Sequence, residues 1–185
     1  MIKKYFLLLL AAILLTGVHG QNRQVDLSQN IPLQDILKKA KKQKKHVLLD
    51  FGSPRCSPCL FIKNKIFTID SVADFINERF VSVDYTEGPE KKRLSKIYEV
   101  YTEPVLLICD ANGRVMHRME GKCTAGEMMA RLRQGLDVKN NLTAQKLMYD
   151  NGNRSSEFLI NYLETLHIAG LRTQRDSVLH NIFSP

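Results

Sequence analysis

Residues 46–59 read HVLLDFGSPRCSPC. The first six are mostly apolar and rich in strand formers, and residues 52–54 end that run with glycine, serine and proline. Two cysteines then follow at C-x-x-C spacing, and apolar residues recur beyond them at helical spacing, at Leu60, Phe61, Ile62, Ile66 and Phe67. We therefore expect a buried strand over residues 47–51, then a loop, then a helix that begins at the first cysteine, Cys56.

Cys56 is the candidate nucleophile. A helix N-terminus offers unpaired N–H groups and a partial positive charge, which stabilise a thiolate, and only the thiolate attacks a disulfide. Cys59 lies one turn further along and can close a ring with Cys56, so we expect it to be the resolving thiol of a redox disulfide. Pro58 stiffens the loop and is tolerated in a first helical turn. The pattern predicts thiol–disulfide exchange.

Two other uses of a C-x-x-C pair stay open. A structural zinc site needs two further ligands, and the remaining cysteines, Cys109 and Cys123, do not form a second C-x-x-C. An inert structural disulfide is the other alternative, although so short a loop constrains the unfolded chain little. Redox chemistry is favoured over both, and neither a metal nor a cofactor is expected.

The composition bounds the kind of protein. The chain has 185 residues, 27 Lys plus Arg against 19 Asp plus Glu, 44% hydrophobic residues and four cysteines. These are globular values, which exclude a disordered chain and a multi-span membrane protein. Four cysteines are too few for a disulfide-dense mini-scaffold. One compact domain with an appendage is predicted.

The positive charge is concentrated in one run of lysines over residues 38–45. It ends a segment whose apolar residues repeat at helical spacing, at Leu33, Ile36, Leu37 and Ala40. This is typical of the solvated face and last turn of an amphipathic helix, where cations suit the helix dipole. No aromatic platform is interleaved with the lysines, so no nucleic-acid partner is expected.

Residues 1–20 have the features of a cleavable signal peptide. Lys3 and Lys4 form a positive region, residues 5–15 are apolar, and residues 18–20 place small residues at a cleavage site before Gln21. The apolar run is shorter than the roughly 20 residues that span a bilayer, and no cysteine follows it directly, so no stable membrane anchor is expected after cleavage. The prediction is a periplasmic or secreted protein in an oxidising compartment.

The order of several motifs along the chain resembles that of a known protein family. The 48–51 strand and the C-x-P-C loop are followed by FVSVD at residues 80–84, YTEPVLLI at residues 101–108, Asn112-Gly113 and Gly121. In this order they resemble a thioredoxin-fold protein over about residues 33–136, and look most like the exported thioredoxin-like proteins of bacteria. The resemblance implies an α/β fold, in which a central mixed sheet, parallel through its first strands and finished by an antiparallel hairpin, is flanked by helices.

The sequence supports this fold independently. Strands are expected over residues 47–51 and 80–85, and helices over residues 70–79, 89–100 and 125–136. Residues 105–108 and 114–119 are expected to form the hairpin around the turn at residues 110–113. Alternating strands and helices are typical of α/β proteins.

The resemblance also implies site residues. Pro104 matches the family's cis-proline, which lies beside the cysteines and presents backbone to an extended substrate segment, with Glu103 immediately before it. From the residues alone a trans proline at a strand start would be expected. Asp50 matches the family's buried acid, which accepts the proton of Cys59 when burial raises its pKa, while a solvated Asp50 at a strand end is the alternative.

Several residues depart from the family pattern. Pro54 and Arg55 replace an aromatic pair, and the chain has no Trp. The lysine that partners the buried acid would fall near Phe80, so Asp50 is expected to lack it. Glu103 replaces a small or β-branched residue. If its carboxylate faces Cys56 it disfavours the thiolate, whereas neighbouring Arg55 favours it. The direction of electron transfer is left undecided.

The remaining chain divides into two parts. Folding the hairpin places Cys109 and Cys123 roughly 30 Å apart, so they are expected to be separate, buried thiols. We expect a thioredoxin-like domain over residues 21–138 and a helical extension over residues 139–185, with two or three short helices and a break at residues 151–153.

The function predicted is that of a cell-envelope protein disulfide oxidoreductase. Its expected partners are protein or peptide thiols and disulfides, together with an unidentified redox partner. The alternative is a non-catalytic thioredoxin scaffold that uses its helical tail to hold a partner or a peptide, because fold alone does not decide function.

Overall fold

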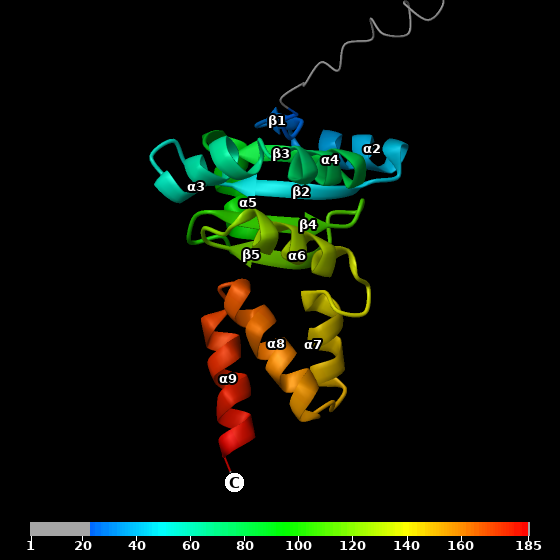
Figure 1. Cartoon of the computed structure of the whole chain (residues 1–185), viewed down its shortest axis with the longest axis vertical. Helices are drawn as coiled ribbons and strands as arrows, with labels where there is room; N and C mark the ends of the chain where they lie inside the picture. The colour runs from blue at the N-terminus through cyan, green and yellow to red at the C-terminus, as the bar shows by residue number, and fades with distance from the viewer. Residues whose placement is uncertain (1–22, 185) are drawn as a thin grey trace, which may run out of the picture.

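The computed structural model describes residues 23–184, so the predicted signal peptide, residues 1–20, lies outside the described residues. A five-stranded mixed sheet forms the centre of the molecule (Figure 1). Its spatial order is β1-β3-β2-β4-β5, and the strands are β1 (Leu27–Gln29), β2 (His46–Phe51), β3 (Phe80–Tyr85), β4 (Val105–Cys109) and β5 (Val115–Glu120).

The strand directions confirm the predicted topology. β1 and β2 both pair parallel with β3, whereas β4 pairs antiparallel with both β2 and β5. The register sets Asp50 of β2 opposite Asp84 of β3 on one side and Leu106 of β4 on the other. β2 is the central strand of the sheet. The cysteine loop, which follows its C-terminal end, therefore lies at the middle of the end of the sheet where β2 finishes.

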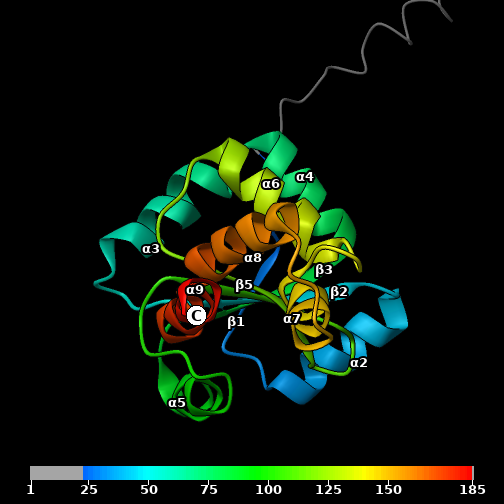
Figure 2. The ribbon, with the colours of Figure 1, turned by 90° about the horizontal axis from the view of Figure 1, so that it is seen from below.

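Helices cover both faces of the sheet. Figure 2 shows α2 (Leu33–Gln43) and α5 (Gly88–Ile97) on one face, and α3 (Ser57–Phe61), α4 (Asp70–Arg79) and α6 (Ala125–Leu136) on the other. Two apolar clusters lie between these layers, because alternate strand residues point to opposite faces. Leu48 joins the cluster under α4 and α6, while Val47 and Leu49 join the cluster under α2.

The helix after the cysteines is less regular than predicted. α3 continues into a π-helix, η1 (Ile62–Ile66), where one continuous α-helix was expected. Such π turns frequently occur at functional sites. Here η1 buries Ile62 and Ile66 in the core and leaves Lys63 partly buried.

Three further helices form the C-terminal tail, as the upper limit of the prediction anticipated: α7 (Leu142–Asp150), α8 (Ser156–Ile168) and α9 (Arg172–Phe183). They lie beyond β5, the edge strand of the sheet (Figure 1). The tail has a small apolar cluster of its own, made by Leu142, Tyr162, Leu166, Ala169 and Val178.

Three hydrogen bonds join the tail to β5. The Leu142 N–H donates to His117 Nδ1 at 3.2 Å, and Thr143 Oγ1 donates to the Val115 carbonyl at 2.9 Å. Arg118 Nε donates to the Ala169 carbonyl at 2.8 Å. The tail therefore covers the sheet edge that β5 would otherwise expose to other chains.

Between residues 23 and 184 the helices are all too short or too polar to span a lipid bilayer.

Candidate functional site

The cysteines of the C-x-x-C motif form a disulfide at the start of α3. Their sulfurs are 2.01 Å apart and their Cα atoms are 5.2 Å apart. Cys56 is the N-cap of α3, and its Sγ accepts the N–H of Cys59 at 3.2 Å. The prediction that the helix begins at Cys56 is confirmed.

The two cysteines differ in exposure. Cys59 is only 2% exposed, whereas Cys56 is partly exposed. Gly52, at the end of the β2 run, allows the close packing of Cys59, because a Cβ at position 52 would lie 3.1 Å from the Cys59 Sγ. An incoming molecule therefore meets Cys56 before it meets Cys59.

Asp50 is buried in β2, with 2% of its surface exposed. Burial raises the pKa of its carboxyl group to about 7, Lys63 opposes the shift, and Asp84 adds to it. The Oδ2 atom of Asp50 has no hydrogen-bond partner among the described residues. Asp50 is thus a buried carboxyl that can hold or release a proton near neutral pH, not the solvated residue of the alternative.

The expectation that Asp50 lacks a lysine partner is wrong. Lys63 Nζ lies 3.9 Å from Asp50 Oδ2 and 2.6 Å from Asp84 Oδ2. It also donates to Thr86 Oγ1 at 3.0 Å. The lysine comes from η1, one helical turn after Cys59, and not from the strand that begins at Phe80.

The Glu103–Pro104 peptide bond is cis, as the resemblance implied. The Pro104 carbonyl accepts the N–H of Gly121 at 3.0 Å, which attaches this segment to the end of β5. Pro104 itself is the last residue before β4 begins at Val105.

The Glu103 side chain faces the disulfide. One of its carboxylate oxygens lies within 4.8 Å of both cysteine sulfurs. Lys91 of α5 donates to Glu103 Oε1 at 2.5 Å. Burial acts to raise the pKa of Glu103, but hydrogen bonds from Lys91 and Ser53 outweigh it and leave the pKa below its usual value. Glu103 is therefore an anion beside the sulfurs, and Lys91 partly compensates its charge.

The other two cysteines are free, buried thiols, as predicted, and they belong to different apolar clusters on the two faces of the sheet. Burial raises the pKa of Cys109 to about 12 and also raises that of Cys123. A thiol that stays protonated is a poor nucleophile and a poor metal ligand. Neither residue joins the redox pair.

Four residues of this region escaped the sequence analysis: Lys63, Asp84, Lys91 and Lys122. Lys122 Nζ lies 3.9 Å from the centre of the Phe61 ring, so its ammonium packs against α3, the helix that begins at the cysteines. The position of Asp84 could have been found, because parallel pairing of the predicted strands brings it opposite Asp50. The three lysines reach the site through tertiary contacts that show no periodicity in the sequence.

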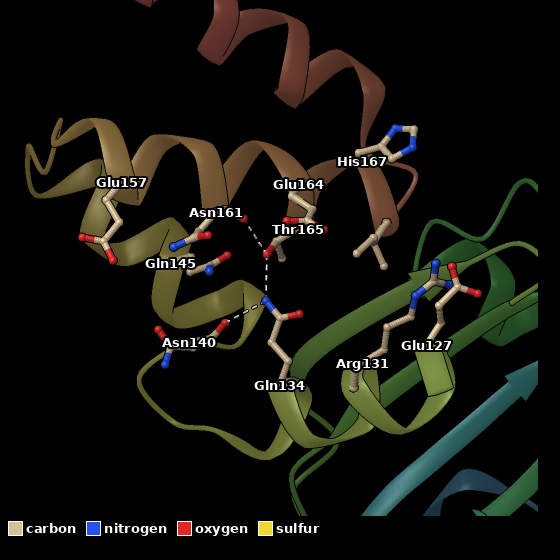
Figure 3. A pocket seen from close by; sticks show the side chains of 12 residues that line it. Glu127, Arg131, Gln134, Asn140, Gln145, Glu157, Asn161, Glu164, Thr165 and His167 are labelled. Atoms are coloured by element: carbon tan, nitrogen blue, oxygen red, sulfur yellow. Dashed lines mark hydrogen bonds between the residues drawn. The ribbon is translucent and has the colours of Figure 1, made fainter. Parts of the chain in front are cut away.

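A separate polar cavity of about 730 Å³ lies between α6 and the tail (Figure 3). Gln134 of α6 crosses its base, donating to Thr165 Oγ1 at 2.8 Å and to the Asn140 carbonyl at 3.3 Å. Gln145 is buried in the cavity wall, and its Oε1 has no partner within residues 23–184. The four cysteines are not among the residues that line this cavity, so it is distinct from the disulfide site.

Comparison with known proteins agrees with this geometry. Residues 33–136 match the family described as the thioredoxin-like domain. A solution structure from Bacteroides thetaiotaomicron, provisionally described as a disulphide isomerase, is 27% identical, with a TM-score of 0.58 over 64% of this chain and 98% of its own. A thioredoxin from Thermus thermophilus is 22% identical, with a TM-score of 0.55 over 64% of this chain and 93% of its own, and it supports the fold alone. No curated protein sequence matches the chain.

Proposed function

The chain belongs to the thioredoxin-like family and is a thiol–disulfide oxidoreductase, in which we propose that Cys56 is the nucleophile. Cys59 is then the resolving thiol. The unequal exposure of the two sulfurs carries this proposal. Cys56 is partly exposed at a helix N-terminus that favours a thiolate, while Cys59 is buried behind it. The substrates we propose are protein or peptide disulfides and thiols.

In the reducing direction, the Cys56 thiolate attacks one sulfur of a substrate disulfide. A mixed disulfide forms between Cys56 and the substrate, and the other substrate sulfur leaves as a thiolate. Cys59 then gives up its proton and attacks the Cys56 sulfur, which releases the second substrate thiolate. The product is the Cys56–Cys59 disulfide, so two electrons pass to the substrate. The oxidising direction is the reverse.

We propose that Asp50 accepts the proton that Cys59 gives up in the resolving step. A carboxyl whose pKa is about 7 is a better proton acceptor than an ordinary aspartate and is still partly ionised at neutral pH. Lys63 holds Asp84 and approaches Asp50, so it limits the rise in the Asp50 pKa and keeps a fraction of this carboxyl ionised.

We place the substrate segment along Glu103 and Pro104. The hydrogen bond from the Gly121 N–H to the Pro104 carbonyl holds this backbone at the end of the sheet where the disulfide also lies. Tyr101, which is 82% exposed, precedes it and adds an accessible aromatic surface. The Glu103 carboxylate would then contact the substrate beside the reacting sulfurs.

We further propose that the protein acts in the cell envelope after removal of residues 1–20. The positive residues, the apolar run and the small residues before Gln21 support this location. N-terminal sequencing of the mature protein, together with cell fractionation, tests it. A mature protein that begins at Met1 and stays in the cytoplasm would refute it.

Single cysteine variants test the assigned roles. Cys56→Ser should abolish disulfide exchange, whereas Cys59→Ser should accumulate mixed disulfides on Cys56, because the resolving step is lost. Non-reducing gels and peptide mass mapping identify the cysteine that carries the adduct. Adducts trapped on Cys59 in the Cys56→Ser variant would reverse the roles, and a wild-type protein that reduces no disulfide would favour the non-catalytic scaffold.

A further inference from the structure

Three potential metal ligands converge at the redox pair. Cys56, Cys59 and Glu103 each offer one ligand atom, and these atoms all lie within 4.8 Å of one another. The sulfurs come from the start of α3, and the carboxylate comes from the segment before β4. We propose that the dithiol form of the protein binds one Zn²⁺ ion through these three residues.

The spacing of the three atoms fits zinc after a small adjustment. Zn–S bonds of about 2.3 Å and Zn–O bonds of about 2.0–2.2 Å place tetrahedral ligand atoms about 3.5–3.8 Å apart. The carboxylate oxygen needs to approach each sulfur by roughly 1.3 Å at most to reach that distance. The two sulfurs, now bonded to each other, must separate, so the site exists only after reduction.

The arrangement resembles a catalytic zinc site more than a structural one. Three protein ligands leave one of four tetrahedral positions for water or for an incoming thiolate. Cys56 is partly exposed, so water or an incoming thiolate can reach a metal bound at its sulfur. The N–H of Cys59, which points at Cys56 Sγ, would stabilise a metal-bound thiolate at that sulfur.

Binding exchanges protons but no electrons. Each thiol loses one proton to become a thiolate ligand, so one Zn²⁺ releases up to two protons, and Glu103 is already an anion. Lys91 opposes the cation, because its ammonium lies 2.5 Å from Glu103 Oε1 and repels a second positive charge there.

The metal and the disulfide exclude each other, because both use the same two sulfurs. An ion that binds only the dithiol form stabilises it by mass action. Bound zinc therefore blocks the nucleophilic sulfur of Cys56 and stops disulfide exchange until the metal is removed. It also protects both thiols from oxidation. This inference does not rest on the proposed substrate, since it concerns metal affinity in each redox state.

Titration with Co²⁺ as a spectroscopic probe, followed by displacement with Zn²⁺, tests the site. The reduced full-length protein should bind one equivalent of Co²⁺ and show thiolate-to-cobalt charge-transfer absorption, and the oxidised protein should not. Glu103→Gln should weaken binding by at least about tenfold, since even outer-shell partners are worth about 10–100-fold in metal affinity. Lys91→Met should tighten binding several-fold, because the repelling ammonium is gone.

The Cys56→Ser variant is the control, since it retains Cys109 and Cys123 and should bind no cobalt. The site is refuted if the reduced protein gives no charge-transfer band although thiol counting shows both cysteines to be reduced. Glu103 is refuted as a ligand if Glu103→Gln, shown by circular dichroism to be folded, binds cobalt as tightly as the wild type. Either failure leaves the cysteine-trapping test of the proposed function untouched.

Discussion

Glu103 and Lys91 place opposite charges beside the same pair of sulfurs. The carboxylate lies within 4.8 Å of both sulfurs, and the ammonium of Lys91 lies 2.5 Å from the carboxylate. A negative charge at that distance disfavours the Cys56 thiolate, and a positive charge behind it reduces the effect. We therefore expect the reducing strength of the protein to depend on this pair of residues and not on Glu103 alone.

We expect Glu103→Thr to raise the fraction of reduced Cys56 that is thiolate and to make the protein more oxidising. A unit charge at about 4 Å contributes about 1 kcal/mol in water-like surroundings, which corresponds to about fivefold in the thiolate population. Lys91→Met is the matched control, and it should shift the same population in the opposite direction. Ultraviolet thiolate titration of the reduced proteins measures both, and equal titrations in all three would show that Arg55 or the helix terminus dominates.

Asp50 links catalysis to stability, because its pKa differs between the folded and unfolded chain. Its ordinary value is 3.8, and burial raises it to about 7 in the folded protein. Between these values the folded state binds more protons than the unfolded state. The contribution of Asp50 to stability therefore falls as the pH rises from about 4 to about 7, by about 1.4 kcal/mol for each pH unit.

Asp50→Asn should remove this fall in stability and should slow resolution of the mixed disulfide by about 100-fold, the usual scale for a lost proton acceptor. In the wild type the resolving rate should increase through pH 7 as Asp50 ionises. Urea unfolding at pH 4 and pH 7, and stopped-flow decay of a mixed disulfide, measure the two effects. A resolving rate that keeps its wild-type pH profile in Asp50→Asn would assign the proton to another group.

The redox residues themselves could be predicted from the sequence, whereas their partners could not. Cys56 and Cys59 stand in one motif, and Asp50 lies in the adjacent strand. Lys63 was missed because the lysine was sought in β3, while the structure supplies it from a π turn of the neighbouring helix. Lys91 reaches the site from α5 across a contact that no local pattern records.

Among the elements, α6 depends on an unusually close approach to the sheet. A Cβ at Gly135 would lie 2.2 Å from Ile108 Cδ1 and 3.1 Å from the Cβ of His117. Glycine at this position lets the helix backbone lie directly on β4 and β5. Gly126 sits at the other end of the same helix, and a Cβ there would meet nothing within 4 Å.

Gly135→Ala should therefore destabilise the protein by about 1–3 kcal/mol, the usual cost of overpacking, although alanine is the better helix former. Gly126→Ala should be neutral or stabilising by up to about 1 kcal/mol, because it gains helix propensity without a clash. Chemical denaturation of the two variants provides the comparison. If Gly135→Ala is as stable as Gly126→Ala, α6 does not pack on the sheet as described.

Element types were more predictable than element ends. The spans 70–79, 80–85 and 125–136 were predicted as they occur, because the spacing of their apolar residues marks them, and Thr124 also caps the start of the last. The helix expected over 89–100 ends instead at Ile97. Two residues later Glu99 adopts a positive φ of 52°, which is not helical. β1 was missed because it has three residues and owes its strand geometry to pairing with β3.

At the scale of the whole molecule, buried polar groups on β5 attach the tail to the sheet. His117 is buried, accepts the Leu142 N–H, and has its pKa lowered to about 4 by burial and by nearby Arg131. Arg118 reaches the carbonyl of Ala169. The apolar spacing of residues 142–182 predicted helices, but it could not predict that their attachment is this polar contact with β5.

The docked tail should make stability sensitive to acid. His117 has a folded pKa of about 4, below the ordinary 6.5, so between these values the unfolded chain binds more protons. Its contribution to stability is present above about pH 6.5 and is lost as the pH falls towards 4. This trend opposes that of Asp50, so the Asp50→Asn variant should show the loss in acid most clearly.

A chain that ends after Asn140 should keep the thiol chemistry and lose part of the stability. Every redox residue proposed here lies before β5, and the family match ends at residue 136. Truncation removes three hydrogen bonds to β5, each worth about 1 kcal/mol. It also exposes His117, whose pKa should move from about 4 towards 6.5, as nuclear magnetic resonance can follow.

Reduction of a small disulfide by the truncated chain should stay within about twofold of the full-length rate, since transition-state contacts are unchanged. If the truncated chain is folded by circular dichroism yet reduces that substrate many times more slowly, the tail belongs to the active site. If His117 already titrates near 6.5 in the full-length protein, the tail does not dock on β5 in solution.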